Sequence, residues 1–177
     1  MKMKKSNLTK VFLLIVLGLT IVSCSKKDDT TNPTNGEIAG VWNCTAVNYT
    51  GTSVTEYLGQ SITTNFTGEG YNVDFTFTIS ENPNVATSNG SYSIKLSSTT
   101  MGQTITQNIE DIEFNFTGEW NKDGNTMTVT QGGKSSDANI VKLTDTELEF
   151  KIANVETIEN SGMTATSTTN TTISFTK

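Results

Sequence analysis

Two side chains that dominate protein catalysis and anion binding are missing from this sequence. Its 177 residues include no histidine and no arginine. Without histidine, one chain cannot form a Ser-His-Asp or Cys-His catalytic arrangement or bind zinc through imidazole. Without arginine, no planar guanidinium is available to bind a carboxylate or phosphate through two parallel hydrogen bonds. We therefore expect a protein that is not an enzyme and that holds neither a metal ion nor a cofactor.

Positive charge is scarce beyond the first ten residues. Four of the 12 basic residues lie within that stretch, namely Lys2, Lys4, Lys5 and Lys10. From residue 24 onward the chain holds the remaining 8 lysines and all 18 acidic residues, which is a formal charge of −10. Such a chain repels nucleic acid and anionic membrane surfaces. We therefore expect no nucleic-acid partner.

One long apolar run stands out in this polar chain. It extends from Val11 to Val22 and follows the basic leader. A membrane-spanning helix needs about 20 residues, so this run is too short to span. A charged leader followed by an apolar run of this length is typical of a signal peptide. The run ends in Ile21-Val22-Ser23-Cys24, which resembles the lipobox of bacterial lipoproteins.

This resemblance implies that residues 1–23 are removed and that the thiol of Cys24 carries a diacylglycerol. The new amine would then be acylated as well, as in other lipoproteins. Each buried methylene contributes about 0.8 kcal/mol, and more than one acyl chain gives stable membrane anchoring. The alternative is an ordinary secretory signal that has a cysteine at its end by chance. After lipidation of Cys24, Cys44 is the only free thiol left, and we expect it to be a small buried strand residue.

Residues 24–36 are predicted to form a solvated tether between the lipid and the folded domain. Apart from the lipidated cysteine they are polar, and Pro33 and Gly36 disfavour regular structure. The triplet Lys27-Asp28-Asp29 resembles the lysine-acid export signals of some Gram-negative surface lipoproteins. That resemblance implies an outer-membrane protein displayed on the cell surface. The alternatives are the periplasmic leaflet and a solvated charge cluster without a role in export.

The remaining residues, 37–177, are predicted to form one β domain because polar and apolar side chains alternate along most of it. Gly70 to Ser80 shows the pattern most clearly, with one face formed by Tyr71, Val73, Phe75, Phe77 and Ile79. In the first strand, Trp42, Cys44 and Ala46 are expected on one face and Val41, Val47 and Tyr49 on the other. Residues 51–60 and 81–89 lack the pattern and are expected to be irregular. About eight to ten strands joined by short turns fit an antiparallel barrel or sandwich.

Short motifs in this region resemble the lipocalin-like domains of bacterial lipoproteins. Ile38-Ala39-Gly40-Val41-Trp42 is similar to the Gly-x-Trp start of lipocalins. Gly118-Glu119-Trp120, the Asp123-Gly124 hairpin and the segment 141–148 are similar to later parts of such domains. The resemblance implies an up-and-down barrel whose first tryptophan packs across the closed end, usually against an arginine of the last strand. Here Lys177 is the only base near that strand. The alternative fold is an immunoglobulin-like β-sandwich, which would lack its usual disulfide.

The resemblance also implies a barrel that binds a small apolar ligand. We expect a modest pocket bordered by Trp42, Phe114, Phe116 and Trp120, although the same aromatic residues could simply fill a core. Because the chain lacks arginine and histidine, the ligand is expected to be neutral. A second hypothesis is a structural or interaction protein of the envelope that holds no ligand. A third is a hydrolase using paired carboxylates, such as Glu110 with Asp111 or Glu147 with Glu149, but acids on a wet strand face are usually just solvated.

Overall fold

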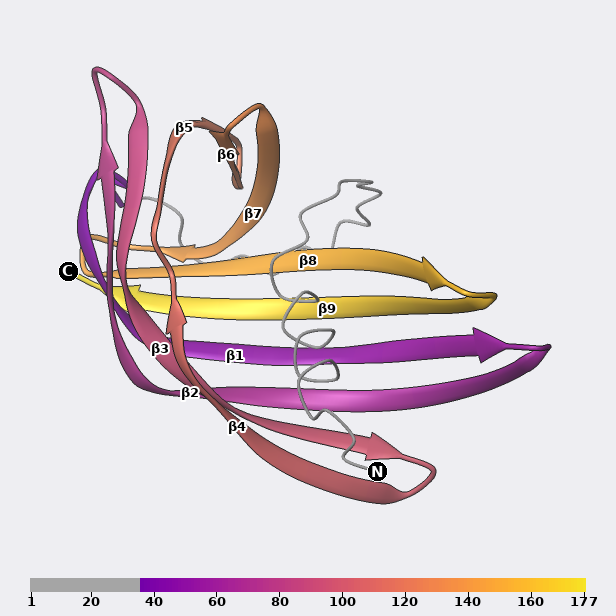
Figure 1. The fold of residues 1–177 in the computed structure, drawn as a ribbon. Coiled ribbons are helices and arrows are strands. Elements are labelled where there is room, and N and C mark those ends of the chain that lie inside the picture. The colour runs from indigo at the N-terminus through magenta and orange to yellow at the C-terminus, as the bar shows by residue number, and fades with distance from the viewer. Residues whose placement is uncertain (1–35) are drawn as a thin grey trace.

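The computed structural model describes residues 36–177, and the regular structure of this part is entirely β (Figure 1). Cys24 and the Lys27-Asp28-Asp29 triplet lie outside the described residues. The nine strands are β1 Gly40–Tyr57, β2 Gln60–Ser80, β3 Val85–Thr100, β4 Gln103–Glu113, β5 Phe116–Asp123, β6 Thr126–Gln131, β7 Lys134–Leu143, β8 Glu147–Asn160 and β9 Met163–Thr176.

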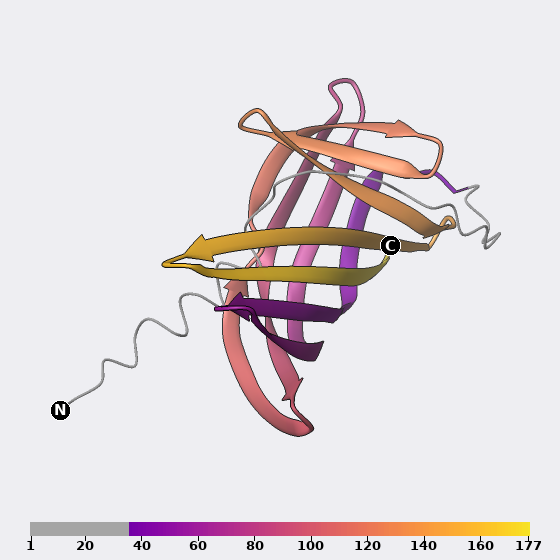
Figure 2. The same ribbon diagram turned by 90° about the vertical axis from the view of Figure 1, so that its right-hand side faces the viewer.

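All strand pairings are antiparallel, and the sheet closes on itself. The strand order is β2-β1-β9-β8-β7-β6-β5-β3-β4, and β2 also pairs with β3. Eight strands thus form a hydrogen-bonded ring, and β4 attaches to the outer half of β3. Figure 2 shows that the sheet is strongly curved. The all-β antiparallel class and the strand number are as predicted. The strands form one sheet rather than the two sheets of a sandwich.

Three hairpins run to the same side of the molecule (Figure 1). They are β1–β2, β3–β4 and β8–β9, and their pairing continues to Tyr57↔Gln60, Thr100↔Gln103 and Asn160↔Met163. Pairing of β9 with β1 and of β2 with β3 joins them into one sheet. We call residues 52–65, 97–106 and 153–168 of these hairpins the extension.

Aromatic side chains fill the interior of the ring. Phe75 and Phe77 on β2 are no more than 5% exposed. The ring centroid of Phe75 lies 4.9 Å from that of Phe114, and the centroid of Phe77 lies 5.7 Å from that of Phe175 and 5.9 Å from that of Phe150. Tilted and edge-on contacts at these distances are the arrangements that aromatic rings prefer. From Phe75 onward, the face of β2 that was predicted to be apolar therefore does face the core.

A β-bulge overturns the predicted faces of the first strand. The register of β1 against β9 shifts between Cys44 and Ala46, so the simple alternation stops there. Val47 is consequently buried together with Trp42 and Cys44, whereas the sequence pattern placed it on the opposite face. The residue types of this stretch do not reveal the bulge. A prediction based on strict alternation therefore assigns the residues after the bulge to the wrong face of the strand.

The segments predicted to be irregular belong largely to strands. β1 continues through residues 51–57, and β3 already begins at Val85. Residues 51–57 have no apolar face that would show period two, and the buried face of residues 85–89 consists of Ala86 and Ser88. Hydroxyl and amide groups pair across strands there instead, as Thr52 does when it donates to Asn65 at 3.1 Å. No helix within residues 36–177 has the length and apolar character that crossing a bilayer requires.

The packing of Phe77 gives a direct test of the core. We expect Phe77→Ala to lower the free energy of unfolding by about 3–5 kcal/mol, because truncating a packed phenylalanine removes contacts and leaves a cavity. Urea denaturation measures this loss. Val41→Ala on the exposed face of β1 is the matched control and should change stability by less than about 0.5 kcal/mol. A loss below about 1 kcal/mol for Phe77→Ala would show that its ring is not packed on all sides.

Candidate functional site

Trp42 lies near the start of β1, beside the end of β9. Its side chain is fully buried, and its indole Nε1 donates a hydrogen bond to the carbonyl oxygen of Ile38 at 2.8 Å. The Nζ atom of Lys177, directly after β9, lies 4.4 Å from the centre of the Trp42 ring and donates to the carbonyl oxygen of Glu37 at 3.1 Å. A cation over the face of an indole is attracted by the ring quadrupole. Lys177 thus packs against Trp42, whereas the resemblance to lipocalins implies an arginine in contact with this tryptophan.

Trp120 is buried in a comparable way on β5. Its Nε1 donates to the carbonyl oxygen of Ser80 at 2.8 Å, and its side chain is nearly covered. Both indole N–H groups are therefore already paired with backbone oxygens. Neither tryptophan offers a free hydrogen-bond donor to a ligand in this arrangement.

Phe114 and Phe116 form the more accessible part of the predicted pocket border. Both are half-buried and pack against the core, and their ring centroids are 5.4 Å apart in an edge-on contact. Phe114 lies in the two-residue break between β4 and β5. Within the described part of the chain, neither Trp42 nor Trp120 makes a ring contact with this pair. The structure therefore brings two of the four predicted residues together and places the two tryptophans elsewhere in the core.

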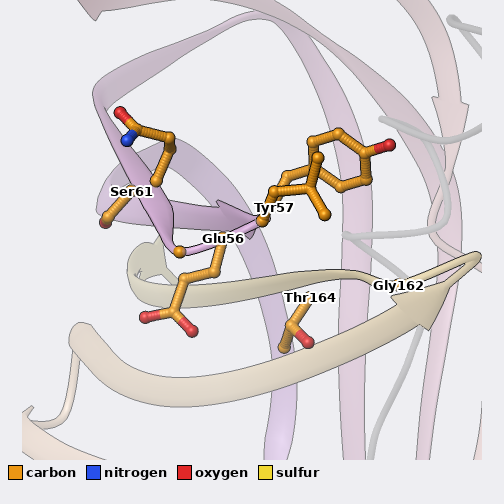
Figure 3. A pocket seen from close by; sticks show the side chains of 8 residues that line it. Glu56, Tyr57, Ser61, Gly162 and Thr164 are labelled. Carbon is orange, nitrogen blue, oxygen red and sulfur yellow. The ribbon is translucent and has the colours of Figure 1, made fainter.

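Two surface pockets of the described region are lined by none of these four residues. One, of about 340 Å³, lies between the ends of the β1–β2 and β8–β9 hairpins and includes Glu56, Tyr57 and Thr164 (Figure 3). Glu56 and Thr164 are direct partners in the β1–β9 register. The other, of about 420 Å³, adjoins the β6–β7 turn at Gly132 and Gly133. The first is formed by hairpin ends, and the second also includes Thr117–Glu119 of β5.

One polar pair on the extension has incomplete hydrogen bonding. Glu156 on β8 and Ser167 on β9 lie directly opposite each other in the register. Ser167 is only 5% exposed, and within residues 36–177 neither its Oγ atom nor the buried Oε2 atom of Glu156 has a hydrogen-bond partner. Buried polar atoms are usually paired. The sequence gives no signal for this pair, because serine and glutamate in a polar strand look like solvated residues.

The carboxylates considered for hydrolysis have partners of other kinds. Glu110 accepts a hydrogen bond from the hydroxyl of Tyr71, and this bond is the main reason that the pKa of Tyr71 is raised. Glu147 forms an ion pair with Lys142 at 2.8 Å. Glu149 accepts a hydrogen bond from Ser174 at 3.3 Å. Residues 36–177 contain no group of three or more cysteine or acidic side chains placed to hold a metal ion.

Cys44 is buried, as the sequence predicts. Its Sγ atom lies 3.6 Å from the carbonyl oxygen of Ala46. Burial raises the pKa of the Cys44 thiol to about 12, although hydrogen bonding to backbone groups partly opposes this. The thiol is therefore protonated at neutral pH and is a poor nucleophile.

No family model, no curated protein and no solved structure matches this chain. The predicted lipid attachment at Cys24 lies outside the described residues and stays a prediction.

Proposed function

We propose that this protein is a lipid-anchored lipoprotein of the Gram-negative outer membrane, displayed on the cell surface, whose β domain binds another envelope component and catalyses no reaction. The lipobox ending in Cys24 supports the anchor, and Lys27-Asp28-Asp29 supports the surface location. The observation that carries the binding proposal is the extension. It continues well beyond the packed ring and has no aromatic core of its own.

The ring itself supports a relationship to lipocalins. Its strands follow one another in an up-and-down order around the ring, and the first strand meets the last. Trp42 lies beneath Lys177 near the start of the first strand, which is consistent with the Gly-x-Trp motif. The interior is occupied by aromatic side chains in mutual contact. This packing favours a ring that serves as a scaffold over a ring that encloses a large ligand.

The extension presents backbone groups that a partner can pair with. β4 pairs only with β3, and Val155–Asn160 of β8 pair only with β9, when the described strands are considered. Edge strands of this kind expose N–H and C=O groups that readily accept an added strand. Thr104, Thr106 and Asn108 on β4 are exposed and uncharged, so no side-chain charge blocks this edge over those residues. An extended segment of another envelope protein is the partner that fits it.

Photo-cross-linking in intact cells tests this proposal. A photoreactive residue at Thr106 on β4 should give a discrete protein adduct, because it lies on the exposed edge. The same residue at Asn125, in the exposed β5–β6 turn, is the matched control and should give none. Ile105→Lys, which adds a charge to the edge, should reduce the Thr106 adduct while leaving the urea midpoint nearly unchanged. Equal adducts at both positions, or none at Thr106, would contradict binding through this edge.

A second function is favoured by the half-buried pair Phe114 and Phe116. These rings border the break between β4 and β5, where a small neutral lipophile could contact them without entering the filled part of the ring. No arginine or histidine is present to neutralise an anionic ligand. This alternative is the ligand-binding function that the lipocalin resemblance implies.

Titration with neutral lipophilic probes, followed by tryptophan fluorescence, separates the two functions. If the ligand-binding alternative is correct, saturable binding should weaken at least about tenfold in Phe116→Ala, because one apolar ring is worth roughly 1.5–3 kcal/mol. Retention of the far-ultraviolet β spectrum shows that the fold survives. If the unsubstituted protein shows no saturable binding, the ligand-binding alternative is wrong and only the interaction function remains.

The anchor has a separate test. We expect Cys24→Ala to remain unlipidated and to be either uncleaved or released from the membrane, because the thiol that accepts the diacylglycerol is gone. Membrane fractionation and mass spectrometry of the N-terminus measure this. Cys44→Ala removes the other cysteine and should be processed normally. Normal processing and membrane association of Cys24→Ala would disprove the lipoprotein assignment.

A further inference from the structure

The ends of the three hairpins that form the extension carry exposed apolar side chains. Leu58 at the β1–β2 turn and Met101 at the β3–β4 turn are each 81% exposed. Met163 follows the β8–β9 turn and is also exposed, and Tyr57 lies beside Leu58. Figure 1 shows the three turns on the same side of the molecule, at the end of the extension. We call these turns, with Tyr57, Leu58, Met101 and Met163, the tips.

The backbone at two of these turns is unfavourable for the residues that occupy it. Leu58 and Met101 have φ angles of 49° and 50°, and each is followed by a glycine with positive φ. Two-residue hairpins of this kind favour asparagine, aspartate or glycine at the first position, because a larger side chain is strained in the left-handed region. The same protein uses Gly132-Gly133 for the corresponding β6–β7 turn on the ring. Strained residues of this kind are often retained for function.

The charges around the tips restrict what they can contact. The extension contains the acidic residues Glu56, Glu156 and Glu159 and no lysine. An anionic surface is therefore repelled, and no cation is present that would attract one. Tyr57 and Met163 are direct partners in the β1–β9 register, so together with Leu58 they form one apolar point. Met101 lies apart from them, because Thr100 pairs with Thr64 and the β3–β4 turn is therefore set back from the β1–β2 turn. The tips are thus two apolar points at different positions along the extension rather than one continuous patch that a protein groove would cover.

We propose that the tips insert into the surface of a lipid bilayer with electrically neutral headgroups. A bilayer accepts separated apolar side chains without requiring a complementary shape, and Tyr57 suits the headgroup level, where tyrosine is enriched. This contact is additional to the acyl chains proposed at Cys24 and does not depend on them. It would make the extension a second, reversible membrane contact of the folded domain.

A local reporter distinguishes this contact from any membrane binding by the N-terminal segment. Both native tryptophans are buried, so Met101→Trp in the full chain adds one exposed fluorophore at a tip. With phosphatidylcholine vesicles containing brominated lipid, its emission should shift to the blue and be quenched. Asn125→Trp, in the exposed β5–β6 turn, is the control and should show neither change. Absence of quenching at the tip, or equal quenching at both positions, would overturn the proposal.

Two further measurements test the physical basis of the membrane contact. Replacing half of the phosphatidylcholine by phosphatidylglycerol should reduce tip quenching, and stronger quenching would refute the charge argument. Adding Leu58→Asn to the Met101→Trp reporter should weaken the tip contact about tenfold, because a large apolar side chain is lost. The same change should raise the urea midpoint, since asparagine tolerates the left-handed conformation. A lowered urea midpoint would contradict this, because it would show that Leu58 has a structural role. If the Met101→Trp reporter responds to envelope protein but not to vesicles, the tips bind a protein and the membrane proposal is wrong.

Discussion

The structure depends on aromatic packing across the interior of the ring. Phe75 and Phe77 from β2 contact Phe175 from β9 and Phe150 from β8, so strands on opposite parts of the ring are held by the same few side chains. The packing is dense because tilted and edge-on contacts let several rings share a small volume. The closed strand order brings these residues together, and their burial in turn stabilises the closure.

The extension is stabilised by other means. Hydroxyl groups pair across its strands, as in Thr64 with Thr100 at 2.6 Å and Thr99 with Thr104 at 2.8 Å. Threonine also suits extended backbone, because its branched side chain restricts χ1. These contributions are individually small. The molecule therefore combines a ring with a hydrophobic core and a sheet whose faces and edges are open to other molecules, which matches the division between scaffold and binding surface proposed above.

The sequence predicted strands that have one dry face better than polar stretches such as residues 51–57. Where a strand has one dry face, as around Phe75 and Phe77, apolar residues recur at every second position and the strand can be read directly. In residues 51–57 hydrogen bonds between polar side chains replace the dry face, so no such pattern exists. The bulge at Cys44 and Ala46 then reversed the expected side of Val47. The burial of Cys44 and Trp42 followed from the pattern, whereas the Glu156–Ser167 pair carries no sequence signal.

The pairing of β1 with β9 has a consequence for when the domain can fold. The first strand of the ring finds one of its two neighbours only in Met163–Thr176, and Lys177 completes the cover over Trp42. Until those residues have been synthesised and released, the ring has an open seam and its aromatic core stays incomplete. A chain emerging from the ribosome thus remains unclosed for most of its synthesis. For the exported lipoprotein proposed above, that delay keeps the chain unfolded, which passage through a narrow translocation channel requires.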